Sequence, residues 1–275
     1  MPKHQLIIVS KIVLIAAAIL FPTTSFSQQA QYDTQIQQDK ALQDEATVVQ
    51  KGKVTETERT YSNEPIYLFG KVERISEAIE SSKKRGNTKE VRITFPIFGD
   101  GVLIDLTSVS DQTKAEVLRD LSCKADAIVL GSPKSKASHL TEDETYIYTE
   151  YEFSVQNVIK DNSASPIKVN SSIQVTRPGG LIKLNDTVVK LDDDSYAPLQ
   201  INKQYLLFLR YVPRAKGYIV SNLKGDFVLE KQSFKTMSKV GIPKEMSSDD
   251  AQSLLNELRN YILSDCGKTS TEDIH

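Results

Sequence analysis

The feature that most constrains the fold is an alternating segment, TYIYTEYEFSVQNVIKD, at residues 145–161. Mostly apolar side chains occupy every second position from Ile147 to Val155, with Thr149 the exception, and mostly polar ones lie between them, as in a half-buried β-strand. After Gln156 this period slips by one residue. One extra residue at Gln156–Asn157 would restore the pattern, so we predict a β-bulge there. Because bulges coil a strand, the slip favours a small barrel over a binding site as its cause.

Several other segments have the composition of strands and are separated by turn residues. They lie at residues 125–132, 167–169, 171–180, 204–212, 217–222 and 226–231. The stretch Arg177–Gly180 (RPGG) predicts a type II turn, with glycine at the position that needs a positive φ. Residues 181–191 predict a hairpin that turns at Asn185-Asp186. The fold class predicted from these patterns is α+β, mainly β.

Three segments have helical periodicity. In residues 73–86 the inward face consists of Ile75, Ala78, Ile79 and Ser82. A helix over about 111–122, with Ser110 as N-cap, turns Val117, Leu118 and Leu121 inward. In the C-terminal helix, capped by Ser247 or Ser248, the apolar residues recur at helical spacing: Ala251, Leu254, Leu255, Leu258 and Ile262.

The chain begins with a segment typical of export. Residues 1–27 combine a basic start, an apolar run and small polar residues before Gln28, which predicts a signal peptide. A membrane anchor is the alternative, but the apolar run of about ten residues is half of what a bilayer-spanning helix needs. We therefore expect an exported protein, either periplasmic or secreted, without a membrane span after cleavage.

The rest of the chain divides by composition. Residues 28–64 form a Gln-rich leader with little apolar periodicity, which we expect to be flexible or transiently helical. Residues 65–122 predict a small strand–helix–strand unit, and residues 123–232 the main β module. Residues 233–266 contain a loop and the amphipathic helix, which we expect to pack on that module, and residues 267–275 form a tail.

Cys123 and Cys266 are the only cysteines in the sequence. In an oxidising compartment an isolated pair usually forms a bridge, so we predict a structural disulfide. A redox pair is the alternative, but a C-x-x-C spacing is absent.

Few residues suit catalysis. After cleavage only His139 and His275 remain as histidines, and His139 lies in a polar stretch that predicts a solvated loop between two strands. Glu150 and Glu152 point the same way from one strand, as the carboxylates of a glycosidase would. The competing interpretation is the wet face of a half-exposed strand. We predict no catalytic residue, no metal site and no cofactor.

A binding surface is the other possibility. Tyr146, Tyr148, Arg177 and Tyr211 are expected on exposed sheet faces, and tyrosine and arginine are the residue types that binding surfaces favour. Cross-strand pairing on the outer face is the alternative role for them. The whole chain has 34 Lys and Arg against 36 Asp and Glu. This mild acidity argues against nucleic acid as a partner.

The order of ADAIVLG, YEFSVQNVIKD, SSIQVTRPGG, NKQYLLFLRYV and GYIVSN resembles a five-stranded OB-like barrel of exported proteins. In outline it resembles the netrin-type module shared with the tissue inhibitors of metalloproteinases, and also uncharacterised exported bacterial proteins. The resemblance covers roughly residues 123–230. Those inhibitors reach zinc through an N-terminal Cys-x-Cys, which the predicted mature start lacks, so that mechanism is not carried over.

These observations predict a non-catalytic binding or interaction module outside the cytoplasm. A protein or polysaccharide of the envelope or exterior is the expected partner. A secreted protease inhibitor that acts through loops and a hydrolase based on carboxylates are the alternatives.

Overall fold

The computed structural model describes residues 45–49, 53, 55–62, 74–86, 90–95, 113–193, 196–220, 225–237 and 250–266. The chain divides into two compact units, residues 1–45 and 46–275, and every element named below lies in the second. The predicted signal peptide, residues 65–73 at the start of the predicted strand–helix–strand unit, and the tail at 267–275 lie outside the described residues.

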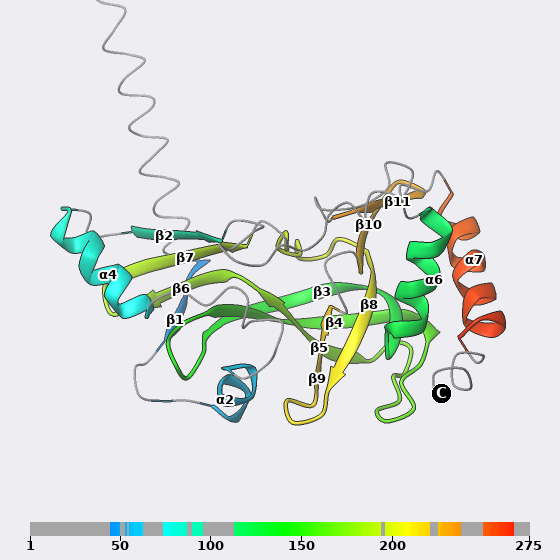
Figure 1. Ribbon diagram of the computed structural model, residues 1–275, viewed down its shortest axis with the longest axis horizontal. Helices are drawn as coiled ribbons and strands as arrows, with labels where there is room; N and C mark the ends of the chain where they lie inside the picture. Colours follow the sequence, from blue (N-terminus) through cyan, green and yellow to red (C-terminus); the bar gives the residue numbers. More distant parts are fainter. Residues whose placement is uncertain are drawn as a thin grey trace, which may run out of the picture. The chain divides into compact units, whose positions relative to one another are not determined.

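The fold is α+β and mainly strands, as predicted (Figure 1). Five strands pair in a closed cycle, in the order β3-β4-β5-β9-β8 and back to β3. Their bounds are β3 Ala127–Leu140, β4 Ile147–Lys160, β5 Ser172–Pro178, β8 Tyr205–Val212 and β9 Gly217–Val220. All these pairings are antiparallel except that of β5 with β9. Beyond β8 the sheet continues through β10 (Asp226–Glu230) to β11 (Ser233–Thr236).

The predicted bulge is confirmed. Leu130 of β3 pairs with Asn157 and Gly131 pairs with Val155, so Gln156 is the extra residue on β4. Two further shifts, after Ile128 and after Pro133, also occur along β3–β4. Each shift increases the local twist, which lets two long strands bend around the cycle.

The predicted polar loop around His139 is wrong. β3 continues to Leu140, and Ser135 to Leu140 pair with Glu152 to Ile147 of β4. Cross-strand pairing, which local composition does not report, extends the strand through these polar residues.

A second sheet has the order β1-β6-β7-β2, with β1 at Thr47–Val49, β2 at Glu90–Phe95, β6 at Gly180–Leu184 and β7 at Thr187–Asp193. The predicted hairpin is confirmed as β6–β7, and Asn185 in its turn has a φ of 55°. At the turn that precedes it, Gly179 has a φ of 82°, as a type II turn requires. β2 and β1 pair parallel to this hairpin, so the sheet crosses the boundary expected at residue 122.

The leader, which its composition predicts to be flexible or transiently helical, contains two ordered elements in its described part, β1 and helix α2 (Glu56–Ser62). Helix α4 (Ile75–Lys84) lies beside β2 at one end of the second sheet (Figure 1). It buries Ile75, Ile79 and Ser82 as predicted.

Helices α6 (Lys114–Lys124) and α7 (Ala251–Ser264) lie side by side, near β8 and far from α4 (Figure 1). Their apolar faces are buried as predicted, but both N-caps differ from the prediction. Thr113 caps α6 through a capping box with Glu116, and Asp250 caps α7 through its carboxylate. Ser110, Ser247 and Ser248 lie outside the described residues.

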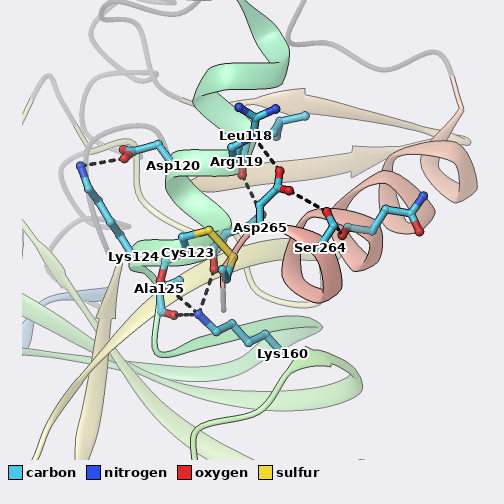
Figure 2. The surroundings of a disulfide bond; sticks show 12 residues. Leu118, Arg119, Asp120, Cys123, Lys124, Ala125, Lys160, Ser264 and Asp265 are labelled. Carbon is cyan, nitrogen blue, oxygen red and sulfur yellow. Dashed lines mark hydrogen bonds and ion pairs between the residues drawn. A yellow bond between two sulfur atoms is a disulfide. The ribbon is translucent and has the colours of Figure 1, made fainter. Parts of the chain in front are cut away.

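The predicted disulfide between Cys123 and Cys266 is confirmed, and it joins the last turn of α6 to the second residue after α7 (Figure 2). An ion pair between Arg119 Nε and Asp265 Oδ2, at 2.8 Å, lies beside it. Lys160, from the end of β4, donates to the backbone carbonyls of Ser122, Cys123 and Ala125 at 2.9, 3.2 and 2.6 Å. The end of α6 is therefore held covalently and electrostatically.

Three apolar clusters form the core. One fills the strand cycle and includes Val129, Phe153, Val175 and Leu207. A second joins α6 and α7 to β8, β10 and β11. The third joins α2 and α4 to the second sheet and to the start of β4. This third cluster brings α2 to the surface described next.

Candidate functional site

One side of β4 and β5 forms the surface of interest. Residues that pair directly across antiparallel strands share a side, so the registers define this surface. On β4 it carries Tyr148, Glu150, Glu152 and Ser154, opposite Pro178, Thr176, Gln174 and Ser172 of β5. His139, Ala137 and Ser135 of β3 continue it on the other flank. We call these residues the β4–β5 face.

Half of the β4–β5 face is open. Glu152, Ser172 and Gln174 are exposed, and so is Ser135 on the neighbouring strand. Glu152 accepts hydrogen bonds from the hydroxyls of Ser135 and Ser172, each at 3.1 Å. This half therefore presents a ladder of polar groups to the solvent.

Helix α2 covers the other half. The hydroxyl of Thr176 donates to the hydroxyl of Tyr61 at 3.0 Å, and the rings of Tyr61 and Tyr148 lie 4.9 Å apart. At the end of α2 the Ser62 hydroxyl accepts from the amide of Glu142, in the β3–β4 loop, at 2.8 Å. Tyr61 is 1% exposed and is the main apolar anchor of α2.

A histidine between two carboxylates lies at the margin of the same contact. His139 Nδ1 is 3.6 Å from Oε1 of Glu58 on α2, and His139 Nε2 is 3.2 Å from Oε2 of Glu150 on β4. The Nε2 contact is an ion pair when the imidazole is protonated. The ring of His139 also stacks on Tyr148, with centroids 5.2 Å apart.

Glu58 is held in place by its own helix. Its backbone amide donates to the Thr55 hydroxyl, and its Oε2 accepts from the Thr55 amide, which is the reciprocal pattern of a capping box. The other carboxylate oxygen, Oε1, is thus left to face His139. One side chain both starts the helix and ties it to the sheet.

The pKa of His139 is raised above its ordinary value. Burial by itself lowers this pKa, but the adjacent carboxylate of Glu150 and the charge of Glu58 outweigh that effect. The side chains of His139 and Glu150 are 24% and 22% exposed, so the cluster is partly buried.

The four residues predicted to bind do not form an exposed surface. Tyr146, Tyr148 and Arg177 are at most 1% exposed, so the expectation of exposure is wrong for them. Tyr146 donates to Asp193 at 2.9 Å, Tyr148 lies under α2, and Tyr211, partly exposed, packs on Tyr218. A helix and a second sheet cover positions that would be exposed on an isolated strand.

Arg177 instead belongs to a buried ion pair. Its Nη2 lies 2.7 Å from Oδ2 of Asp226, and its guanidinium lies over the ring of Tyr196 at 5.5 Å. Burial raises the pKa of Asp226, and the guanidinium opposes that effect. Nε and Nη1 of Arg177 have no hydrogen-bond partner within the described part of the chain. Arg177 therefore has a role inside the fold.

The carboxylates expected on a wet strand face are both engaged. Glu150 contacts His139, and Glu152 accepts from the two serines. Among the described residues, no three His, Cys, Asp or Glu side chains gather as they would around a metal ion. Nor is any helix of the described segments both long and apolar enough to cross a membrane.

The chain was compared with models of protein families and with curated proteins. No model of a protein family matches the chain, and no curated protein matches it in sequence.

Sequence reasoning missed α2 and the histidine cluster. One local signal for α2 exists, because Thr55-Glu56-Thr57-Glu58 has the spacing of a capping box. Nothing local connects Glu58 with His139 and Glu150, since the three come from α2, β3 and β4. Only the docking of α2 on the strands brings them together.

Proposed function

We propose that this chain is an exported, non-catalytic binding module, periplasmic or secreted, whose five-strand cycle is an OB-like barrel. OB-like barrels bind along the face of their second and third strands and with the loops beside it. Counted along the cycle, those strands are β4 and β5. The binding surface in this proposal is the β4–β5 face, in place of the surface predicted from Tyr146, Tyr148, Arg177 and Tyr211.

The observation that carries the proposal is the state of that face. Its open half presents Glu152, Ser172 and Gln174, and its other half is occupied by α2. A face that already receives one polar segment of the chain has the groups to receive another. An extended protein segment or a polysaccharide of the envelope or exterior would match its row of hydroxyl, amide and carboxylate groups.

The test is capture in the native compartment. The protein, tagged at its C-terminus, is cross-linked in its own envelope or culture fluid, and the products are identified by mass spectrometry. We expect one dominant protein or polysaccharide whose yield falls at least severalfold in Glu152→Ala with Gln174→Ala. Glu77→Ala with Gln252→Ala removes the same two residue types from exposed positions on α4 and α7, and should leave capture unchanged.

Equal capture by both double variants would contradict the β4–β5 face as the binding surface. Tyr148→Ala with Arg177→Ala is unsuited to this test, because both side chains are buried and their loss would disturb folding.

A carboxylate hydrolase is the second candidate, favoured by the partly exposed cluster of Glu58, His139 and Glu150. Such a cluster contains an acid and a base within contact distance. Turnover on a panel of glycosides and esters that disappears in Glu150→Gln would support it and replace the binding proposal.

A further inference from the structure

We infer that α2 is a pH-sensitive latch on the β4–β5 face, closed when His139 is protonated and released when His139 is neutral. This inference rests on the proposed function for its purpose, because the latch would control access to the binding surface. Its physical basis is independent of any ligand, and it can be tested without one.

The contacts of α2 fall into two kinds. Tyr61 contributes an apolar contact and a hydrogen bond, and Ser62 accepts from the amide of Glu142; these contacts do not change with pH near neutrality. The contact between Glu58 and His139 does depend on pH, because it joins a carboxylate to a group with an ordinary pKa near 6.5. A seven-residue helix is marginal by itself, so it depends on its contacts with the rest of the fold.

The groups around His139 all favour the protonated form when α2 is closed. From α2 it faces Glu58, and from β4 it faces Glu150 and the ring of Tyr148. Burial raises the pKa of the Tyr148 hydroxyl, so this group stays neutral. Arg59, the next charged residue of α2, forms an ion pair with Glu142, at 3.4 Å.

The direction of the pH effect follows from this arrangement. The pKa of His139 is above its ordinary value in the closed form. Release of α2 removes the Glu58 charge, which raises this pKa, and part of the burial, which lowers it; the latch requires the first effect to be the larger. Protonation therefore favours closure fully below the pKa of the open form. The advantage disappears as the pH rises through the pKa of the closed form.

Nuclear magnetic resonance tests the latch on the full chain. The chain contains three histidines, His4, His139 and His275, so the His139 imidazole signal is identified by its loss in His139→Gln. We expect a pKa above 6.5 for His139 that falls in Glu58→Gln. Hydrogen exchange of the amides of Arg59 to Ser62, expressed as protection over intrinsic exchange, should fall as His139 loses its proton. A difference of one pKa unit between closed and open forms corresponds to about a tenfold change in protection.

Variants separate the latch from general loosening. In His139→Gln the protection of α2 should be independent of pH, and in Glu58→Gln its pH step should shrink. Arg59→Gln breaks a contact of the same helix outside the cluster, so it should lower protection at every pH and keep the step. A pH step of full size in His139→Gln, or a wild-type protection that stays flat, would overturn the inference.

Failure of the latch and failure of the proposed function give different results. A flat exchange profile together with capture that depends on Glu152 and Gln174 would remove the latch and leave the binding role. A clear pH step in exchange with no captured partner would keep the latch and remove the binding role.

Discussion

Arg177 and Asp226 show most clearly how the fold changes the role of a residue from the one predicted by its strand pattern. On an isolated strand Arg177 would project into water, whereas here it is 1% exposed and Asp226 is 2% exposed. Two charges at this depth lose their hydration, so each depends on the other for compensation. The pair therefore lies in the interior of the fold, and removing one partner should lower the free energy of unfolding.

We expect Arg177→Met to lower the free energy of unfolding by about 3–5 kcal/mol, because it leaves Asp226 buried without its partner. Replacing both, as Arg177→Met with Asp226→Leu, should cost far less, since the buried charge disappears with its partner. Urea unfolding of Arg177→Met, of Asp226→Leu and of the double variant measures this difference. Additive losses would show that the two side chains do not compensate each other.

Lys160 works at a helix end rather than in an ion pair. Its ammonium donates to three carbonyls at the last turn of α6 (Figure 2), and burial lowers its pKa. We expect Lys160→Met to cost about 1.5–3 kcal/mol, the range for hydrogen bonds to charged groups. Lys124→Met is the control, because Lys124 pairs with Asp120 at an exposed site where such pairs contribute about 0–1 kcal/mol. Equal thermal stabilities of the two variants would contradict this role.

At the scale of elements, α7 is placed by its apolar face and by the disulfide. Leu254 on that face is fully buried, while Leu263 on the same helix is 84% exposed. The two leucines therefore report separately on docking and on helix formation.

A charge at position 254 should undock α7. We expect Leu254→Asp to lower the free energy of unfolding by at least about 3 kcal/mol, because it removes a core leucine and buries a carboxylate. Leu263→Asp should stay within about 0.5 kcal/mol of the wild type. Chemical denaturation with the disulfide intact measures both. Similar losses in the two variants would mean that α7 is not held by this face.

Helix α2 shows the opposite balance. It is short, its anchor is one tyrosine, and most of its other contacts are polar. Contacts of this kind are weak enough to be exchanged for contacts with a partner. The buried apolar contacts of α7 are too strong for such an exchange. This difference between apolar burial and polar contacts distinguishes the structural helix α7 from the candidate latch α2.

For the whole molecule, the decisive step is the pairing that closes the five-strand cycle. β3 must pass close to β4 beside the bulge, and Gly131 makes that approach possible. A Cβ atom at residue 131 would lie 2.1 Å from the backbone oxygen of Ser154. At Gly217 in β9, the nearest atoms to such a Cβ lie at 3.5 Å, an ordinary contact.

We therefore expect Gly131→Ala to destabilise the fold by about 2 kcal/mol or more through backbone displacement. Gly217→Ala should have little effect, which makes it the matched control within the same cycle. Thermal unfolding followed by circular dichroism compares them. A Gly131→Ala protein as stable as the wild type would show that β3 and β4 can separate locally without cost to the cycle.

Local patterns were enough to predict the strand character of the cycle, the bulge at Gln156, the β6–β7 hairpin and the inward faces of α6 and α7. Each depends on the period or the turn residues of one segment, and such information is present in neighbouring positions. The disulfide followed from the presence of only two cysteines.

Tertiary structure alone decided the rest. β3 extends through His139 because β4 pairs with it, and β2 joins β7 across the expected boundary because parallel pairing connects distant segments. The exposure of Tyr148 and Arg177 depended on what covers them, and the histidine cluster on where α2 docks. These properties arise from contacts between residues far apart in the chain, and the periodicity of any single segment does not encode them.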